Sequence, residues 1–201
     1  GLPGPHICDF WTREASAANY DDGSTFHIGR IDMVANTGTY VDAPFHRFAD
    51  GADLAGLPLQ SLADLPGLVV RRPHAAGIAT DAADLAGRDV RGKAVLVHTG
   101  WDEHWHTDAY AQDHPFLTAA AADWLATEGA ALVGIDSYNI DDTRGRGRPV
   151  HTRLLGAGIP ICEHMTSLAR LPNDGFRFTA APPKIVGLGS FPVRAFAAID
   201  G

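Results

Sequence analysis

Short stretches of alternating or consecutive apolar residues recur along the whole of this chain. Residues 26–35 alternate imperfectly, and their pattern fits a strand better than a helix. Further apolar runs are rich in β-branched and aromatic residues and end at Gly or Pro, which predicts short buried strands. These runs are residues 67–72, 94–100, 130–135, 159–163, 176–180, 184–189 and 193–198.

One helix is clear in the sequence. Thr118 can cap the segment AAAADWLATE, and Gly129 gives the usual glycine stop before the next apolar run. This step from a helix to a buried strand is typical of α/β proteins. Shorter helices are predicted at 79–86 and 165–171. The balance predicts an α/β fold richer in strands than a doubly wound one, and the sequence contains no GxGxxG, GxxxxGK[ST] or GxSxG motif.

The length and composition predict one globular domain over residues 1–201. The chain is 45% hydrophobic and 20% charged, without repeats or a long linker. Residues 1–25 are rich in turn-forming residues and are expected to form an arm that wraps the surface. Phe10 and Trp11 make this arm too apolar for a free segment, so we expect it to cover a neighbouring site or a partner subunit.

The charge balance narrows the expected partners. The formal net charge is −8, which argues against nucleic acid and against an anionic membrane surface. No apolar run approaches the length of about 18–20 residues that a membrane span needs. The first residues lack the pattern of a signal peptide, and the only cysteines are Cys8 and Cys162. We therefore expect a cytoplasmic protein that acts on a small molecule.

The segment at residues 36–51 concentrates groups capable of chemistry. Tyr40 and Asp42 share one face of an extended stretch, and Pro44 then forces a turn that can bring His46 back toward Asp42. A carboxylate and an imidazole at such a bend suit a divalent cation, or a base beside one. The alternative is that Asp42 caps a turn and His46 is an ordinary surface histidine.

A second candidate segment lies late in the chain. His151 opens a short apolar turn, and Glu163 ends a predicted strand twelve residues later. A carboxylate at the end of a buried strand is costly unless it is paired or binds a metal. His164 would point to the opposite face and is expected to be structural, and Asp136 either supports a ligand histidine or caps a loop.

Two further stretches have open interpretations. Trp101 and Trp105 lie in a run that also holds His104 and His106, and they line either a substrate pocket or a subunit contact. A metal role for the two histidines is the less favoured alternative to solvation. The basic run RGRGR at 144–148 is expected to be solvated rather than to bind an anionic group.

The sequence NTGTYVDAPFH at 36–46 resembles the motif H-x-G-T-H-x-D-x-P-x-H of the cyclase-family metal hydrolases. This group includes bacterial kynurenine formamidases and isatin hydrolases. The matching residues are Gly38, Thr39, Asp42, Pro44 and His46. The late His and Glu spacing, TGW at 99–101, GIDS at 134–137 and the segment 184–197 are also similar to family segments. The resemblance implies a compact β/β/α fold with a metal-dependent hydrolytic site.

This chain departs from the motif at two positions. Two-metal members hold one cation with the two motif histidines that Asn36 and Tyr40 replace here, and an amide or phenol is a poor substitute for imidazole. The resemblance thus leaves a site for one cation, Zn²⁺ or Mn²⁺, with Asp42, His151 and Glu163 as ligands. His46 would be the general base, Tyr40 a donor to the oxyanion, and Asn36 a group that orients Tyr40 or the substrate.

The resemblance implies a hydrolase of an amide, lactam, lactone or ester bond in a small carbonyl compound, assembled as a homodimer or homotetramer. Two alternatives stay open. One is a non-catalytic binding protein that keeps the fold and the pocket, which the Asn36 and Tyr40 replacements suggest. The other is a metal-assisted lyase, dehydratase or cyclase, because a polarised carbonyl beside a base also suits proton abstraction.

Overall fold

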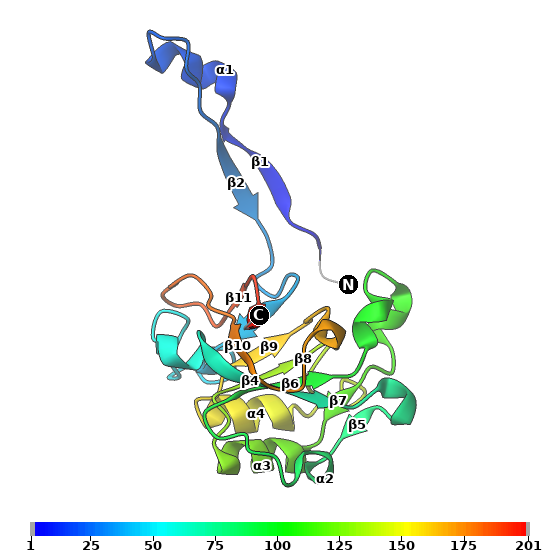
Figure 1. Ribbon diagram of the computed structural model, residues 1–201. Helices are drawn as coiled ribbons and strands as arrows, with labels where there is room; N and C mark the ends of the chain where they lie inside the picture. The colour runs from blue at the N-terminus through cyan, green and yellow to red at the C-terminus, as the bar shows by residue number, and fades with distance from the viewer. Residues whose placement is uncertain (1–2, 200–201) are drawn as a thin grey trace. The chain divides into compact units, whose positions relative to one another are not determined.

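The computed structural model describes residues 3–199, and the chain divides after Thr37 into two compact units (Figure 1). In the first unit, β1 (His6–Trp11) pairs with β2 (Ile28–Asp32) as an antiparallel hairpin. The short α1 (Arg13–Ser16) and the 3-10 turn η1 (Ala17–Asn19) connect them. β2 confirms the strand predicted at 26–35. Two statements stay predictions: one domain spans the chain, and the arm at residues 1–25 wraps a surface.

The second unit is built on an eight-stranded sheet, within the part of the chain that the structure describes. Its strand order is β11-β3-β9-β8-β6-β4-β10-β12. The four central strands run parallel, and the outer strands pair antiparallel on both sides. Central strands are β4 (Leu65–Arg71), β6 (Ala94–His98), β8 (Leu132–Ile135) and β9 (Ile161–Glu163). Outer strands are β3 (Tyr40–Asp42), β10 (Phe176–Thr179), β11 (Ser190–Pro192) and β12 (Phe196–Ile199).

Helices cover one face of this sheet, as Figure 1 shows for α2 (Ala82–Leu85), α3 (Ala119–Glu128) and α4 (Pro149–Gly156). The predicted helix boundaries of α3 are confirmed, because Thr118 caps its first turn and Gly129 ends it in the left-handed region. A small parallel sheet joins β5 (Ala79–Thr80) to β7 (Phe116–Leu117). The remaining turns are the 3-10 segments η2 (Pro44–His46), η3 (Leu59–Ser61), η4 (His74–Ala76), η5 (Trp101–His104), η6 (Asp108–Ala111) and η7 (Leu168–Arg170).

The sheet is buried on both faces, which explains why its central strands appear in the sequence as continuous apolar runs. On the helical face, Leu125 and Leu154 pack with Val97 and others into one core cluster. On the opposite face, Leu96 and Phe178 belong to a second cluster that loops cover. Fully burying each such side chain contributes about 1.5–3 kcal/mol.

Four predicted elements differ from the structure, one of them the strand predicted at 193–198, which forms only from Phe196 as β12. The strand predicted at 184–189 is wrong: the Leu188 and Gly189 carbonyls accept hydrogen bonds from the 43–54 region instead of a strand, and β11 starts only at Ser190. The helix predicted at 165–171 is reduced to η7, because Ser167 adopts a left-handed conformation with φ 64°. The helix predicted at 79–86 is confined to α2, since residues 79–80 form β5.

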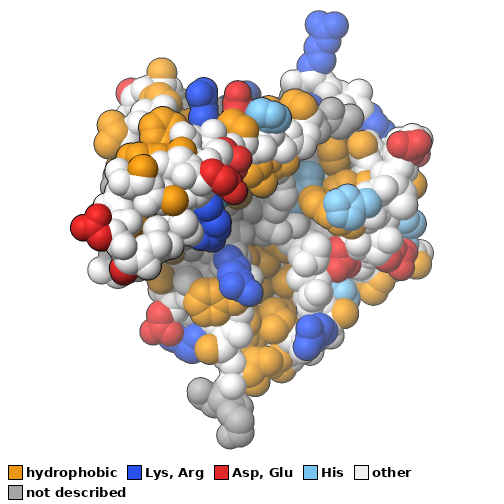
Figure 2. All heavy atoms as spheres, turned by 90° about the horizontal axis from the view of Figure 1, so that it is seen from above, with side chains coloured by type: hydrophobic (Ala, Val, Ile, Leu, Met, Phe, Trp, Pro, Cys, Tyr) orange, Lys and Arg blue, Asp and Glu red, His pale blue; other side chains and the backbone are white. Residues whose placement is uncertain are grey.

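Exposed apolar side chains occur in both units. Ile7, Phe10 and Ile31 of the hairpin are at least 60% exposed, and Ile7 lies directly opposite Ile31 across the strands. Figure 2 shows histidine side chains lying among hydrophobic and acidic ones on the face it presents. Within residues 3–199, none of the helices has the length and apolar character needed to cross a membrane.

Candidate metal centre

Strand β3 supplies two of the predicted residues from a fully buried position. Asp42 lies opposite Ser190 of β11, and Tyr40 lies opposite Glu163 of β9. Because side chains alternate along a strand, Tyr40 and Asp42 share one face, as predicted. The register therefore brings carboxylates from two ends of the chain onto adjacent strands.

The turn after β3 returns His46 to Asp42. Pro44 stands at the start of η2, where its fixed φ suits a helical turn, and His46 is four residues after Asp42. Gly189 lies so close that an added Cβ would be 2.5 Å from the His46 backbone nitrogen. This approach allows Ser190 to reach both side chains: its hydroxyl donates to Asp42 Oδ1 and lies 2.9 Å from His46 Nδ1.

Helix α4 presents His151 to the same place. The carboxylate of Asp141 accepts hydrogen bonds from the backbone N–H groups of Val150 (2.8 Å) and His151 (3.0 Å) at the first turn of the helix. Its Oδ2 also lies 2.6 Å from His151 Nδ1. A carboxylate only accepts, so Nδ1 carries a proton and Nε2 faces the centre. This is the support that metal-binding histidines usually have.

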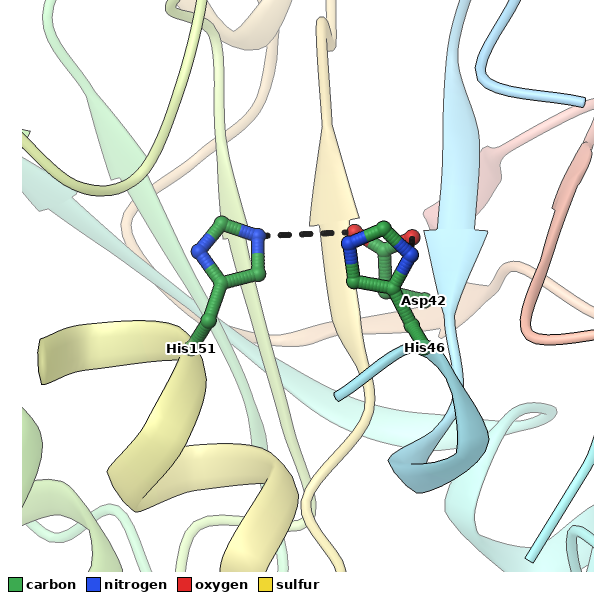
Figure 3. A group of neighbouring side chains, drawn as sticks. All are labelled: Asp42, His46 and His151. Carbon is green, nitrogen blue, oxygen red and sulfur yellow. Dashed lines mark ion pairs between the residues drawn. The ribbon is translucent and has the colours of Figure 1, made fainter. Parts of the chain in front are cut away.

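His151 faces both predicted carboxylates, whereas the ligand atoms that all lie within 4.8 Å of one another belong to Asp42, His46 and His151, without Glu163. His151 Nε2 is 3.6 Å from Asp42 Oδ2 and 3.6 Å from Glu163 Oε1. Figure 3 shows the His151 ring pointing from α4 toward the Asp42 carboxylate, with His46 beside that carboxylate. His46 Nδ1 is 3.5 Å from Asp42 Oδ1, and the rings of His46 and His151 are 5.7 Å apart.

Glu163 is held from two sides. The Tyr40 hydroxyl donates to its Oε2, and the backbone N–H of Ile140 donates to its Oε1 at 2.6 Å. The hydroxyl proton of Tyr40 therefore lies in its hydrogen bond to Glu163. Donation to an oxyanion, as predicted for Tyr40, requires that this hydrogen bond open.

Burial and mutual charge shift the pKa values of two groups in this cluster. Burial opposes protonation of His151, but the charge of Glu163 and the hydrogen bonds to Asp141 and Asp42 raise its pKa to about 10. Burial, with the charge of Asp42, also raises the pKa of Glu163. Both shifts mean that these groups take up a proton more readily than they do in water, and a metal ion on His151 Nε2 would have to displace that proton.

The donor set fits a divalent metal. Ligand atoms around tetrahedral Zn²⁺ have bond lengths of about 2.0–2.2 Å, so they stand about 3.3–3.6 Å apart. The two separations of 3.6 Å from His151 Nε2 lie at the upper end of this range. Two carboxylates and one imidazole are ligands that both Zn²⁺ and Mn²⁺ accept.

The other predicted site residues are placed differently. Trp105 lies 5.5 Å, ring to ring, from His164, which in turn lies 5.3 Å from Tyr40, so it is near the centre. Trp101 instead packs on His74 and His104. Asn36 belongs to the first unit, and its proposed role stays a prediction.

His164 and Asp136 are each held by contacts of their own. Aromatic rings surround His164, and burial lowers its pKa to about 4. Asp136 accepts from the Thr99 backbone and hydroxyl and from the Gly100 N–H, so it holds the loop after β6 and not the loop that follows Asp136, as one of its two predicted roles required.

Sequence reasoning missed Asp141 and Ser190. Asp141 carried no local signal, because it stands eight residues before Pro149 and reaches the first turn of α4 only through the intervening loop. Ser190 carried none of its own, since its place depends on the pairing of β11 with β3.

Comparisons with known proteins show which family the chain resembles. Residues 6–142 match the Cyclase family, described as "Putative cyclase". The chain is 31% identical to a kynurenine formamidase of Erythrobacter litoralis over 83% of this chain and 74% of that protein. It is 30% identical to a kynurenine formamidase of Salinibacter ruber over 92% and 84% of the two chains.

Solved structures share the fold. An isatin hydrolase bound to the product analogue thioisatinate matches with a TM-score of 0.81 at 23% identity, covering 98% of this chain and 82% of that one. A structure described as a potential metal-dependent hydrolase with cyclase activity matches with a TM-score of 0.73 at 28% identity, covering 96% of both chains.

The strand-rich α/β fold, its buried acidic and imidazole cluster and these relatives together define a hydrolase. More particularly, the chain belongs to the cyclase family, as its sequence motif indicated.

Proposed function

We propose that the protein hydrolyses an amide, lactam, lactone or ester bond in a small carbonyl compound, with one divalent cation held by Asp42, His151 and Glu163. The observation that carries the proposal is the convergence of His151 Nε2 on two buried carboxylates at 3.6 Å. The names of the formamidase and isatin hydrolase relatives denote amide cleavage and favour amides within this group.

A cation in this place would polarise the substrate carbonyl and lower the pKa of a water molecule. The protein's own groups then handle the proton. The Ser190 hydroxyl donates its hydrogen bond to Asp42 Oδ1, so its oxygen accepts from His46 Nδ1–H, and the lone pair of His46 lies on Nε2.

His46 is thereby prepared as a general base. Nε2 takes a proton from water as the new C–O bond forms, and it returns that proton to the leaving nitrogen or oxygen as the scissile bond breaks. His46 is 36% exposed in its side chain, which gives substrate and water access to Nε2. In this account Tyr40 is a positioning residue that restrains Glu163 through its hydroxyl.

Trp105, together with the rings around His164, offers an aromatic wall close to Tyr40. Flat aromatic carbonyl compounds are the substrates that such a wall would accept best. We also propose that the exposed apolar hairpin joins subunits as a dimer or tetramer, and that the enzyme works in the cytoplasm.

The test uses His46→Ala and Glu163→Gln, with isatin and aryl formamides as probes and bound metal counted by elemental analysis. His46→Ala should keep its metal and lose about 10²–10⁴-fold in kcat, the usual contribution of a general base. Glu163→Gln should lose metal and turnover together. Incorporation of ¹⁸O from labelled water into the product should accompany turnover.

Two results would contradict the proposal. One is folded His46→Ala protein that turns over at the wild-type rate. The other is stoichiometric metal that survives unchanged in Glu163→Gln.

A further inference from the structure

A second group of ligand-type side chains lies beyond the ends of two neighbouring strands and shares no residue with the first centre. His74 belongs to η4, which follows β4, whereas Glu103 and His104 belong to η5, which follows β6. β4 and β6 are parallel neighbours, paired from Gly67 with Ala94 to Arg71 with His98. The two loops therefore leave the same edge of the sheet side by side.

The donor atoms of this group face one another. Glu103 Oε1 is 3.4 Å from His74 Nε2 and 3.5 Å from His104 Nε2. The three ligand atoms all lie within 4.8 Å of one another. Both nitrogen–oxygen separations exceed the usual hydrogen-bond range of about 2.7–3.2 Å. They fall within the spacing of about 3.3–3.6 Å between ligands of a tetrahedral zinc ion.

The outer contacts of His74 set its orientation. Its Nδ1 lies 3.1 Å from the carbonyl oxygen of Thr99, which can only accept, so Nδ1 carries a proton. In the neutral ring, the lone pair is then on Nε2, toward Glu103. Thr99 is itself fixed, since its N–H and hydroxyl donate to Asp136 at 2.7 and 2.6 Å. This chain of support resembles the one that ligand histidines need.

Trp101 holds the two imidazole rings in place. Its ring centroid is 5.2 Å from that of His74 and 4.3 Å from that of His104, both edge to face. The indole is buried, and its N–H donates to the carbonyl of Tyr110 at 2.9 Å. The side chains of His74 and His104 are 28% and 32% exposed, so an ion can enter from solvent and keep water ligands.

We propose that His74, Glu103 and His104 form a second metal site, which binds a divalent transition-metal ion of the Zn²⁺ type. Two imidazoles select such ions over Mg²⁺ and Ca²⁺, which prefer oxygen ligands. The sequence did not favour a metal role for His104 and His106, and the structure places His104 beside the distant His74. A bound ion joins the loops after β4 and β6 and fixes η5, whose next residue is Trp105.

The experiment compares Zn²⁺ binding to metal-stripped wild type, His74→Asn and His104→Asn by equilibrium dialysis and elemental analysis. Each variant should bind one Zn²⁺ per chain fewer than wild type, or bind that ion at least tenfold more weakly. His106→Asn is the matched control, because His106 lies in the same loop outside the cluster, and it should bind as wild type does. The readout is a difference, so it holds whether or not the Asp42 centre takes an ion.

Thermal unfolding of the metal-free proteins checks the variants. We expect similar Tm values without metal, and a larger rise in Tm with Zn²⁺ for wild type than for His104→Asn. Glu103→Gln, at an exposed side chain, replaces any histidine variant that fails to fold and should show the same deficit. Folded variants that bind as many Zn²⁺ ions as wild type, with equal affinity, would overturn the second site.

Discussion

Replacing Asp141 by Asn tests how the first centre is organised. Asp141 Oδ1 accepts from the Val150 N–H, while Oδ2 accepts from both the backbone and the ring of His151. An amide offers only one oxygen. If its NH₂ group faces the His151 ring, Nδ1 must accept, the ring proton moves to Nε2, and that nitrogen can no longer bind a metal.

If the amide is turned the other way, its NH₂ group opposes the Val150 N–H, whereas in the first orientation it opposes the His151 N–H, so a buried donor loses its partner in either case. That loss costs about 1–3 kcal/mol in the free energy of unfolding. The orientation that turns the NH₂ group toward the His151 ring should lower metal affinity about 10–100-fold, the usual effect of removing such support. This is equivalent to about 1.4–2.7 kcal/mol of binding free energy.

The assay is a Zn²⁺ competition titration with a chromophoric chelator, together with urea unfolding of the metal-free protein. Asp142→Asn is the matched control, because the Asp142 side chain pairs with Arg144 outside the cluster. Its metal affinity should equal that of wild type. Asp141→Asn protein with wild-type affinity and wild-type stability would refute the reasoning.

Three further predictions follow from other contacts. Ser190→Ala removes the link between His46 and Asp42, and kcat should fall about tenfold to a hundredfold with metal content unchanged. Burial lowers the pKa of His114 below 6.5. Below about pH 6.5 the unfolded chain therefore binds a proton at His114 that the folded chain does not bind, and the free energy of unfolding falls as the pH drops. His114→Asn should flatten this slope by up to about 1.4 kcal/mol per pH unit. Ile7→Asp with Phe10→Asp should convert the oligomer to a smaller species, measured by light scattering.

Each of these has a contrary outcome. If Ser190→Ala keeps the wild-type kcat, Ser190 does not prepare His46 as the general base. An unchanged slope between pH 6.5 and 5 in His114→Asn, measured by urea unfolding, would mean that another group causes the acid sensitivity. A wild-type protein that is already monomeric would remove the assembly proposal.

Much of the fold was predictable because its strands are buried and its helix ends are marked. The apolar runs that became β4, β6 and β8 were recognisable from residue type alone. The apolar run at 184–189 was wrongly predicted to be a strand. Apolar residues in loops that cover a sheet face, such as Leu188, give the same pattern. The helix α4 was taken for a turn at His151, since it is only eight residues long and follows a polar, glycine-rich loop.

The candidate site was predictable where a short motif or a family resemblance fixed it. Asp42 and His46 are four residues apart, so a proline turn between them suffices. The residues that support the ligands come from distant loops and depend on strand order, which no local pattern reveals. The pairing of His74 with His104 is of this kind, because it needs β4 and β6 to be neighbours.

The most direct test of the central claim is a crystal structure with anomalous scattering data collected at the absorption edge of the bound metal. The account predicts a peak coordinated by Asp42, His151 and Glu163, with His46 outside the ligand set. A metal bound by Asp42, His46 and His151 without Glu163, or a centre that stays empty in active enzyme, would contradict it.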